Sequence, residues 1–153
     1  MRKAVAIDAN LLVLFIVGTT STQYIAKHKR CAMFELRDFE LLIAVLLEAA
    51  EVILTPNTLT EASNLLRQIS EPARTEVSLV FQAYVQRAAE RYVESRQATK
   101  RTEFIRLGLA DAALLEIQND DIVLLTTDLD LYLSACRDGR RALNFFHLKE
   151  ART

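Results

Sequence analysis

The segment Ile122-Val123-Leu124-Leu125-Thr126-Thr127-Asp128 is the most strand-like stretch of the chain, and it ends on an acid. A short apolar run bounded by polar residues is typical of a strand that is buried on both faces of a parallel sheet. Residues 3–7, 52–55 and 142–146 have the same character. The pattern therefore predicts a mostly parallel sheet of about four to five strands.

Helical patterns lie between these strands. Apolar residues at helical spacing predict helices over residues 11–17, 39–50, 109–118 and 129–137, and two more that begin near Thr58 and Pro72. The helix after Pro72 carries an inward-facing stripe that places two tyrosines in the core: Val77, Phe81, Tyr84, Ala88 and Tyr92. Strands that alternate with helices form βαβ units. We expect one α/β domain over residues 1–153, with a three-layer α/β/α architecture.

The overall composition is that of an ordinary globular domain. The formal net charge is -1, so no global basic field attracts nucleic acid, and any such binding needs local basic patches or metal ions. Cys31 and Cys136 are isolated and are expected to be free thiols. The apolar run 11–17 is far shorter than a membrane span, and Asp8 interrupts the region where a signal peptide would be apolar. We expect an unprocessed cytoplasmic protein without a membrane partner.

Four acids follow the predicted strands. Asp8 comes directly after the first strand and Asp128 after the third. Glu61 is predicted in the first turn of the helix after the second strand, and Asp111 in the first turn of the helix that Gly108 precedes. Ligands of open α/β sheets bind outside the carboxyl ends of the strands. We therefore expect all four carboxylates to project from the same edge.

Each acid also has a purely structural interpretation. Asp8 and Asp128 are good helix N-caps, and such a cap is worth about 1 kcal/mol. Thr58-Leu59-Thr60-Glu61 matches a capping box, in which the glutamate accepts a hydrogen bond from the first backbone N–H. Asp111 complements a helix dipole, which is worth about 0.3–1 kcal/mol.

As a set, the four acids need a counter-charge. In a partly dehydrated cleft they would repel one another, and some would take up protons. No Lys, Arg or His adjoins any of the four in the sequence. A divalent cation supplies the missing charge, and carboxylate oxygens favour Mg²⁺ or Mn²⁺.

The motifs of several other hydrolytic sites are absent. The chain has neither a GxSxG nucleophile turn nor a GxxxxGK[ST] phosphate loop, and neither His28 nor His147 stands at a predicted strand end. Carboxylates with a bound divalent cation can hold a phosphodiester and activate a water molecule. A metal-dependent phosphodiesterase is therefore the leading interpretation.

At these residues the chain resembles the PIN-domain nuclease family. The similarity covers most of the chain, from Ala6-Ile7-Asp8-Ala9-Asn10 to Thr126-Thr127-Asp128. The four acids of the family fall, in order along the chain, on Asp8, Glu61, Asp111 and Asp128, with Asp130 as an additional candidate metal ligand.

The resemblance implies an α/β/α fold and an endoribonuclease that depends on Mg²⁺ or Mn²⁺. It also implies the toxin of a type II toxin–antitoxin pair, with RNA as substrate, a cognate antitoxin as partner, and a homodimeric state. One departure is the polar segment 19–39, which is longer than in the small toxins of the family. Two alternatives stay open: another Mg²⁺-dependent phosphohydrolase, and a catalytically silent PIN-like binding module. Asn10 weakens the first, because such phosphatases usually carry a second Asp at this position.

Basic residues give candidates for substrate binding. Lys27, Lys29 and Arg30 form the clearest basic run, for which a solvated surface is the commonest explanation and a phosphate-contact patch the alternative. Lys100 and Arg101 precede Asp111 and are candidates to reach substrate beside the metal site.

Three further polar residues complete the candidates. Arg96 is a weaker candidate for contact with substrate. Asn10 and Thr127 are candidates to hydrogen-bond a metal-binding carboxylate or a metal-bound water. For Thr127, satisfaction of the local backbone at the strand end is an equal alternative.

Overall fold

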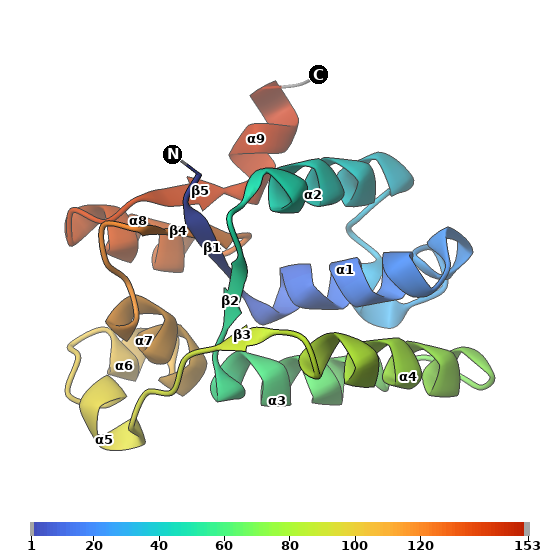
Figure 1. The fold of residues 1–153 in the computed structure, drawn as a ribbon, viewed down its shortest axis with the longest axis horizontal. Coiled ribbons are helices and arrows are strands. Elements are labelled where there is room, and N and C mark those ends of the chain that lie inside the picture. Colours follow the sequence, from blue (N-terminus) through green and yellow to red (C-terminus); the bar gives the residue numbers. More distant parts are fainter. Residues whose placement is uncertain (1, 152–153) are drawn as a thin grey trace.

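Five parallel strands form the central sheet of the computed structural model, which describes residues 2–151 (Figure 1). The strands are β1 (Ala4–Ile7), β2 (Val52–Leu54), β3 (Ala89–Glu90), β4 (Ile122–Thr126) and β5 (Ala142–Asn144). Their order is β3-β2-β1-β4-β5, and every neighbouring pair is parallel. The predicted parallel sheet is therefore confirmed, with β1 at its centre.

Helices connect these strands. The connections are α1 (Ala9–Thr20), α2 (Leu36–Glu48), α3 (Pro56–Leu66), α4 (Ala73–Val85), α5 (Ser95–Ala98), α6 (Phe104–Leu107), α7 (Leu109–Glu116) and α8 (Leu129–Arg137), with α9 (Phe145–Ala151) after the last strand. Two 3₁₀ turns, η1 (Thr22–Tyr24) and η2 (Lys29–Cys31), lie between α1 and α2.

The alternating side chains of β1 divide the core in two. Val5 and Ile7 pack with apolar residues of α1, α2, α3 and α4 on one face of the sheet. Ala6 packs on the other face, with apolar residues of α7 and α8. The helices on the two faces and the sheet between them make the three-layer α/β/α architecture that the sequence predicts (Figure 1).

The sheet order creates a crevice beside the central strand. The chain runs from β1 outward to β2 and β3, and then returns to place β4 on the other side of β1. The helix after β1 covers one face and the helix after β4 covers the other. The connections therefore diverge at the carboxyl ends of β1 and β4, where open α/β sheets bind ligands.

The helix predicted through Tyr92 is wrong in its second half. Helix α4 ends at Val85, and the chain then adds the edge strand β3, with Arg91 donating its backbone N–H to Leu54 at 2.8 Å. Tyr92 is consequently 79% exposed and not in the core. Tyr84 does pack inside, edge-on to Phe15 with ring centroids 5.0 Å apart.

Gly18 does not end the first helix, contrary to the sequence-based expectation. Helix α1 continues to Thr20, and a Cβ at position 18 would lie 2.3 Å from Cδ1 of Phe39. The glycine is there because α2 approaches α1 closely. At the other end of the chain, the predicted last strand is too long, since Phe145 already begins α9.

The polar segment between α1 and α2 is anchored to the core. Ile25, Cys31 and Phe34 are buried among the residues of the first core. This anchoring places Lys27, Lys29 and Arg30 on the surface near α1, with His28 buried between them. Over residues 2–151, no helix has the length and apolarity needed to cross a membrane.

Candidate functional site

The four predicted acids line one small cavity at the crevice. Its volume is about 90 Å³, and Asp8, Glu61, Asp111 and Asp128 share its walls with Asn10. We call it the acid cavity. Asp8 and Asp128 come from the ends of β1 and β4, Glu61 from α3 and Asp111 from α7. Segments up to 120 residues apart in the chain therefore converge, as expected from the sequence.

Asp8 is the buried and most constrained member. Its Oδ1 accepts the backbone N–H of Leu11 at 3.0 Å, so it caps α1. Its Oδ2 accepts the hydroxyl of Thr126 at 2.5 Å, the N–H of Thr127 at 2.9 Å and the hydroxyl of Thr127 at 3.3 Å. Burial raises the pKa of Asp8, while these donors act in the opposite direction. The carboxylate is thus held in one orientation.

Thr126 links two of the acids. While its hydroxyl donates to Asp8, its oxygen accepts the backbone N–H of Asp128 at 3.0 Å. Asp128 in turn caps α8 by accepting the N–H of Leu131 at 2.9 Å. Thr127 is a candidate from the sequence and Thr126 is not, because a threonine inside a β-strand carries no signal beyond its strand propensity.

Glu61 is not part of a capping box. Helix α3 begins at Pro56 with Thr55 as its N-cap, and the hydroxyl of Thr55 accepts the N–H of Thr58 at 3.1 Å. Glu61 therefore lies in the second turn of α3, whereas the first turn was predicted from the sequence. The structural interpretation of Glu61 as a cap is excluded. Burial raises its pKa, as does the charge of Asp8, while Arg30 lowers it.

Asp111 lies in the first turn of α7, as predicted. Gly108, just before this helix, has φ 90° and ψ 177°, a conformation essentially restricted to glycine. No described residue donates a hydrogen bond to the Asp111 carboxylate. Burial, followed by the charges of Asp128, Asp8 and Glu61, raises its pKa to about 7. Burial and three like charges therefore favour the protonated form of Asp111.

The basic run lies beside the acid cavity. Lys29, Arg30 and Asn10 line an adjoining hollow of about 190 Å³, and Asn10 belongs to both hollows. His28 anchors this loop: its Nδ1 accepts the N–H of Arg30 at 3.1 Å, and its Nε2 lies 3.1 Å from the carbonyl oxygen of Leu66. Nε2 is therefore the protonated nitrogen. This role could not be predicted, since a lone histidine in a basic run looks like a surface residue.

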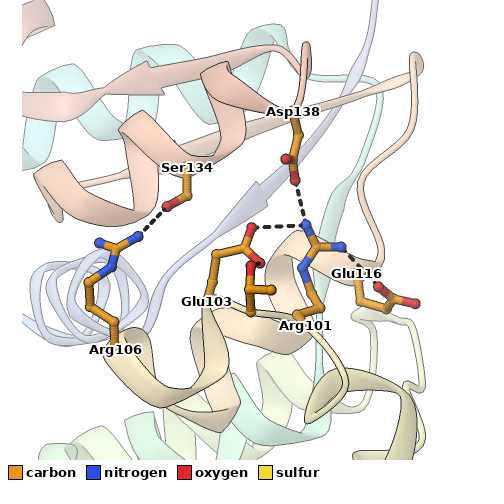
Figure 2. A network of polar contacts seen from close by, with 7 residues as sticks. Arg101, Glu103, Arg106, Glu116, Ser134 and Asp138 are labelled. Atoms are coloured by element: carbon orange, nitrogen blue, oxygen red, sulfur yellow. Dashed lines mark hydrogen bonds and ion pairs between the residues drawn. The ribbon is translucent and has the colours of Figure 1, made fainter.

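Arg101 is held away from the acid cavity. Its guanidinium lies between Glu103, Glu116 and Asp138 (Figure 2). The distance is 3.3 Å to Glu103 and 3.0 Å to Glu116. Glu116 and Asp138 stand at the C-terminal ends of α7 and α8, whereas Asp111 and Asp128 stand at the N-terminal ends. The position predicted for Arg101, beside the metal site, is not the one observed.

Asp130 and the remaining basic candidates also lie apart from the cavity. Arg106 approaches Asp130 at 3.7 Å and donates to Ser134 at 3.1 Å (Figure 2 shows the second contact). Lys27, Arg96 and Lys100 are exposed and contribute to neither the acid cavity nor the hollow beside it.

The donor set of the acid cavity suits a hard divalent cation. Carboxylates and an amide oxygen are the ligands that Mg²⁺ and Mn²⁺ prefer. As the side chains stand over residues 2–151, however, no three His, Cys, Asp or Glu groups converge as a ligand set for a metal ion. Glu61 and Asp111 accept no hydrogen bond within this range, so rotation toward a common point breaks none. The chemistry fits a cation, and closure of the site needs side-chain rotation.

Comparison of the chain with known protein families and with curated proteins finds no match. The interpretation of the site therefore depends on its own geometry and charge.

Proposed function

We propose that this protein is an endoribonuclease that hydrolyses phosphodiester bonds with Mg²⁺ or Mn²⁺ at the acid cavity. The observation that carries the proposal is the convergence of Asp8, Glu61, Asp111 and Asp128 on one cavity. No basic residue among the described ones lines that cavity. Asp8 is buried, Asp111 is half-buried, and Glu61 and Asp128 are exposed. Four carboxylates gathered at one cavity repel one another, so such an arrangement is expected where the charges bind a cation.

The residues around the acid cavity have different roles in this proposal. A bound divalent cation supplies charge neutralisation for the phosphodiester and lowers the pKa of water. Asp8, fixed by its four hydrogen bonds, is the rigid wall of the site. Glu61 and Asp111 are the adjustable carboxylates, and Arg30, beside Glu61, is placed to meet a phosphate of the bound strand.

The surroundings of the cavity favour a polymeric substrate over a small phosphomonoester. Hollows of about 190 Å³ and 430 Å³ adjoin it; the smaller shares Asn10 with it, and the larger shares Glu61 and Ala110. A strand bound at the acid cavity therefore has room to continue into neighbouring hollows. This arrangement favours a nuclease over another Mg²⁺-dependent phosphohydrolase.

The biological part of the proposal comes from the resemblance to PIN-domain toxins. In that interpretation the protein is a homodimer and is inhibited by a cognate antitoxin. Native mass spectrometry of the purified protein tests the first point, since a homodimer gives twice the mass of the 17.3 kDa chain.

Cleavage of a labelled single-stranded RNA in Mn²⁺ tests the activity. Asp111→Asn removes a site charge without breaking a hydrogen bond to a described residue, and we expect it to slow cleavage on the order of a thousandfold, or about 4 kcal/mol. Glu116→Gln, on the same helix but outside the cavity, is the matched control and should keep most activity. Equal rates for the two variants would remove the acid cavity from the reaction.

A further inference from the structure

A second hollow lies against the acid cavity on the side of α3 and α7. Its volume is about 430 Å³, and Asn57, Thr60, Asn64 and Leu109 line it. We call this hollow the amide trough. Glu61 and Ala110 line both the trough and the acid cavity, so the two spaces adjoin.

The polar side of the trough is one stripe of α3. Asn57, Thr60, Glu61 and Asn64 are spaced i, i+3, i+4 and i+7, which places them on the same face of the helix. The side chains of Asn57, Thr60 and Asn64 form no hydrogen bond with any described residue. Their donors and acceptors are therefore free for a ligand.

The charges that line the two neighbouring hollows differ. In the smaller hollow Lys29 and Arg30 supply positive charge beside Asn10. The trough has neutral amide and hydroxyl groups, with Glu61 as its charged member. A phosphate is therefore favoured in the basic hollow, whereas no cationic residue that the structure describes lines the trough. An uncharged group with hydrogen-bonding edges suits the trough better.

We propose that the amide trough is a recognition subsite for an unpaired nucleobase of the RNA strand that passes through the acid cavity. This inference rests on the proposed function. An amide presents a donor and an acceptor together and can pair with the edge of a base through two hydrogen bonds. Leu109 offers an apolar surface to the ring. In single-stranded RNA the base edges are available for such contacts.

Binding of short RNAs tests the subsite without requiring cleavage. Fluorescein-labelled pentamers of A, C, G and U are titrated, in Mg²⁺, into the Asp111→Asn protein and into the same protein with Asn57→Ala and Asn64→Ala. Alanine has a higher helix propensity than asparagine, so α3 is retained. Gln68→Ala in the Asp111→Asn protein is the control, because this exposed amide follows α3 outside the trough.

We expect the Asp111→Asn protein to bind one base about tenfold more tightly than the weakest, and the double alanine substitution to reduce this ratio to about twofold or less. The Gln68→Ala control should keep the ranking. An unchanged ranking after the double substitution, or no binding of any pentamer, overturns the subsite. Amide-dependent ranking in a protein whose parent never cuts RNA supports the subsite and contradicts the nuclease. Cleavage of RNA by the parent protein without such a ranking supports the nuclease and contradicts the subsite.

Discussion

The two ends of the helix pair α7 and α8 hold carboxylates in opposite ways. At the C-terminal ends, Glu116 and Asp138 join Glu103 around the guanidinium of Arg101 (Figure 2). At the N-terminal ends, Asp111 and Asp128 meet Asp8 and Glu61 in the acid cavity, and no basic residue that the structure describes lines that space. The same two helices thus carry one acidic cluster built around a cation, which we call compensated. The other, which we call uncompensated, has no basic residue among the described ones in its lining, and Arg30 acts on Glu61 from outside it.

The pKa values express this difference. The pKa of Glu103 is lowered by its own backbone N–H and by Arg101, which together outweigh the effect of burial. The pKa of Asp111 is raised to about 7 by burial and by three like charges. One end of the helix pair therefore lowers the pKa of a carboxyl group, and the other end raises the pKa of another. Strongly perturbed pKa values of the second kind are typical of functional sites.

The largest expected effect on stability is at Asp111. Its folded-state pKa of about 7 exceeds the ordinary value of 3.8, so between these pH values the folded chain keeps a proton that the unfolded chain has lost. Raising the pH through this window therefore lowers stability. In EDTA at pH 8, Asp111→Asn should be more stable than the unsubstituted protein by about 4 kcal/mol, with no difference near pH 3.5. Urea unfolding at the two pH values measures this, and a destabilised variant at pH 8 would contradict it.

Loss of Arg101 should act in the opposite direction. Arg101→Met leaves Glu103, Glu116 and Asp138 without their shared cation, and the side chain of Glu103 is only 15% exposed. Because hydrogen bonds to charged groups are worth about 1.5–3 kcal/mol and this cluster is partly solvated, we expect a loss of about 2 kcal/mol in urea unfolding. RNA cleavage per folded molecule should not change. A variant as stable as the parent would show that the compensated cluster contributes nothing.

Asp130 should have the smallest effect. Its contact with Arg106 is long, at 3.7 Å, and both side chains are largely exposed. Such surface pairs contribute little, so Asp130→Asn should change stability by less than about 0.5 kcal/mol. Cleavage of RNA in Mn²⁺ should stay within about twofold of the parent. A loss comparable to that of Asp111→Asn would return Asp130 to the site, where the resemblance to the PIN family places it.

Much of the fold could be predicted because its signals are local. The apolar run of β4 ends on Asp128, and the apolar run of β1 ends on Asp8, so the strands and the acids that follow them are visible together. The parallel order then brings those acids to one edge. The two-residue strand β3 gave no signal, because it exists only through pairing with β2. Tyr92 was misplaced for the same reason.

The errors at the site have a different origin. Arg101 stands ten residues before Asp111 in the sequence, yet tertiary packing directs it to the other ends of α7 and α8. Conversely, Arg30 stands far from Glu61 in the sequence, and the contacts of His28 with Arg30 and Leu66 bring its loop beside α3. Sequence patterns indicate which charges are unusual for their element, and long-range packing decides which of them meet.

Thermal unfolding with Mn²⁺ or EDTA tests the central claim, that the uncompensated cluster binds a divalent cation. At a concentration about a hundredfold above its dissociation constant, a bound ion adds about 2.7 kcal/mol, which for a chain of 153 residues raises Tm by roughly 5–10 °C. The account predicts this rise for the unsubstituted protein and for Glu116→Gln, and its loss in the Glu61→Gln, Asp111→Asn double variant. Equal Tm values in Mn²⁺ and EDTA for the unsubstituted protein, or an undiminished rise in the double variant, would contradict it.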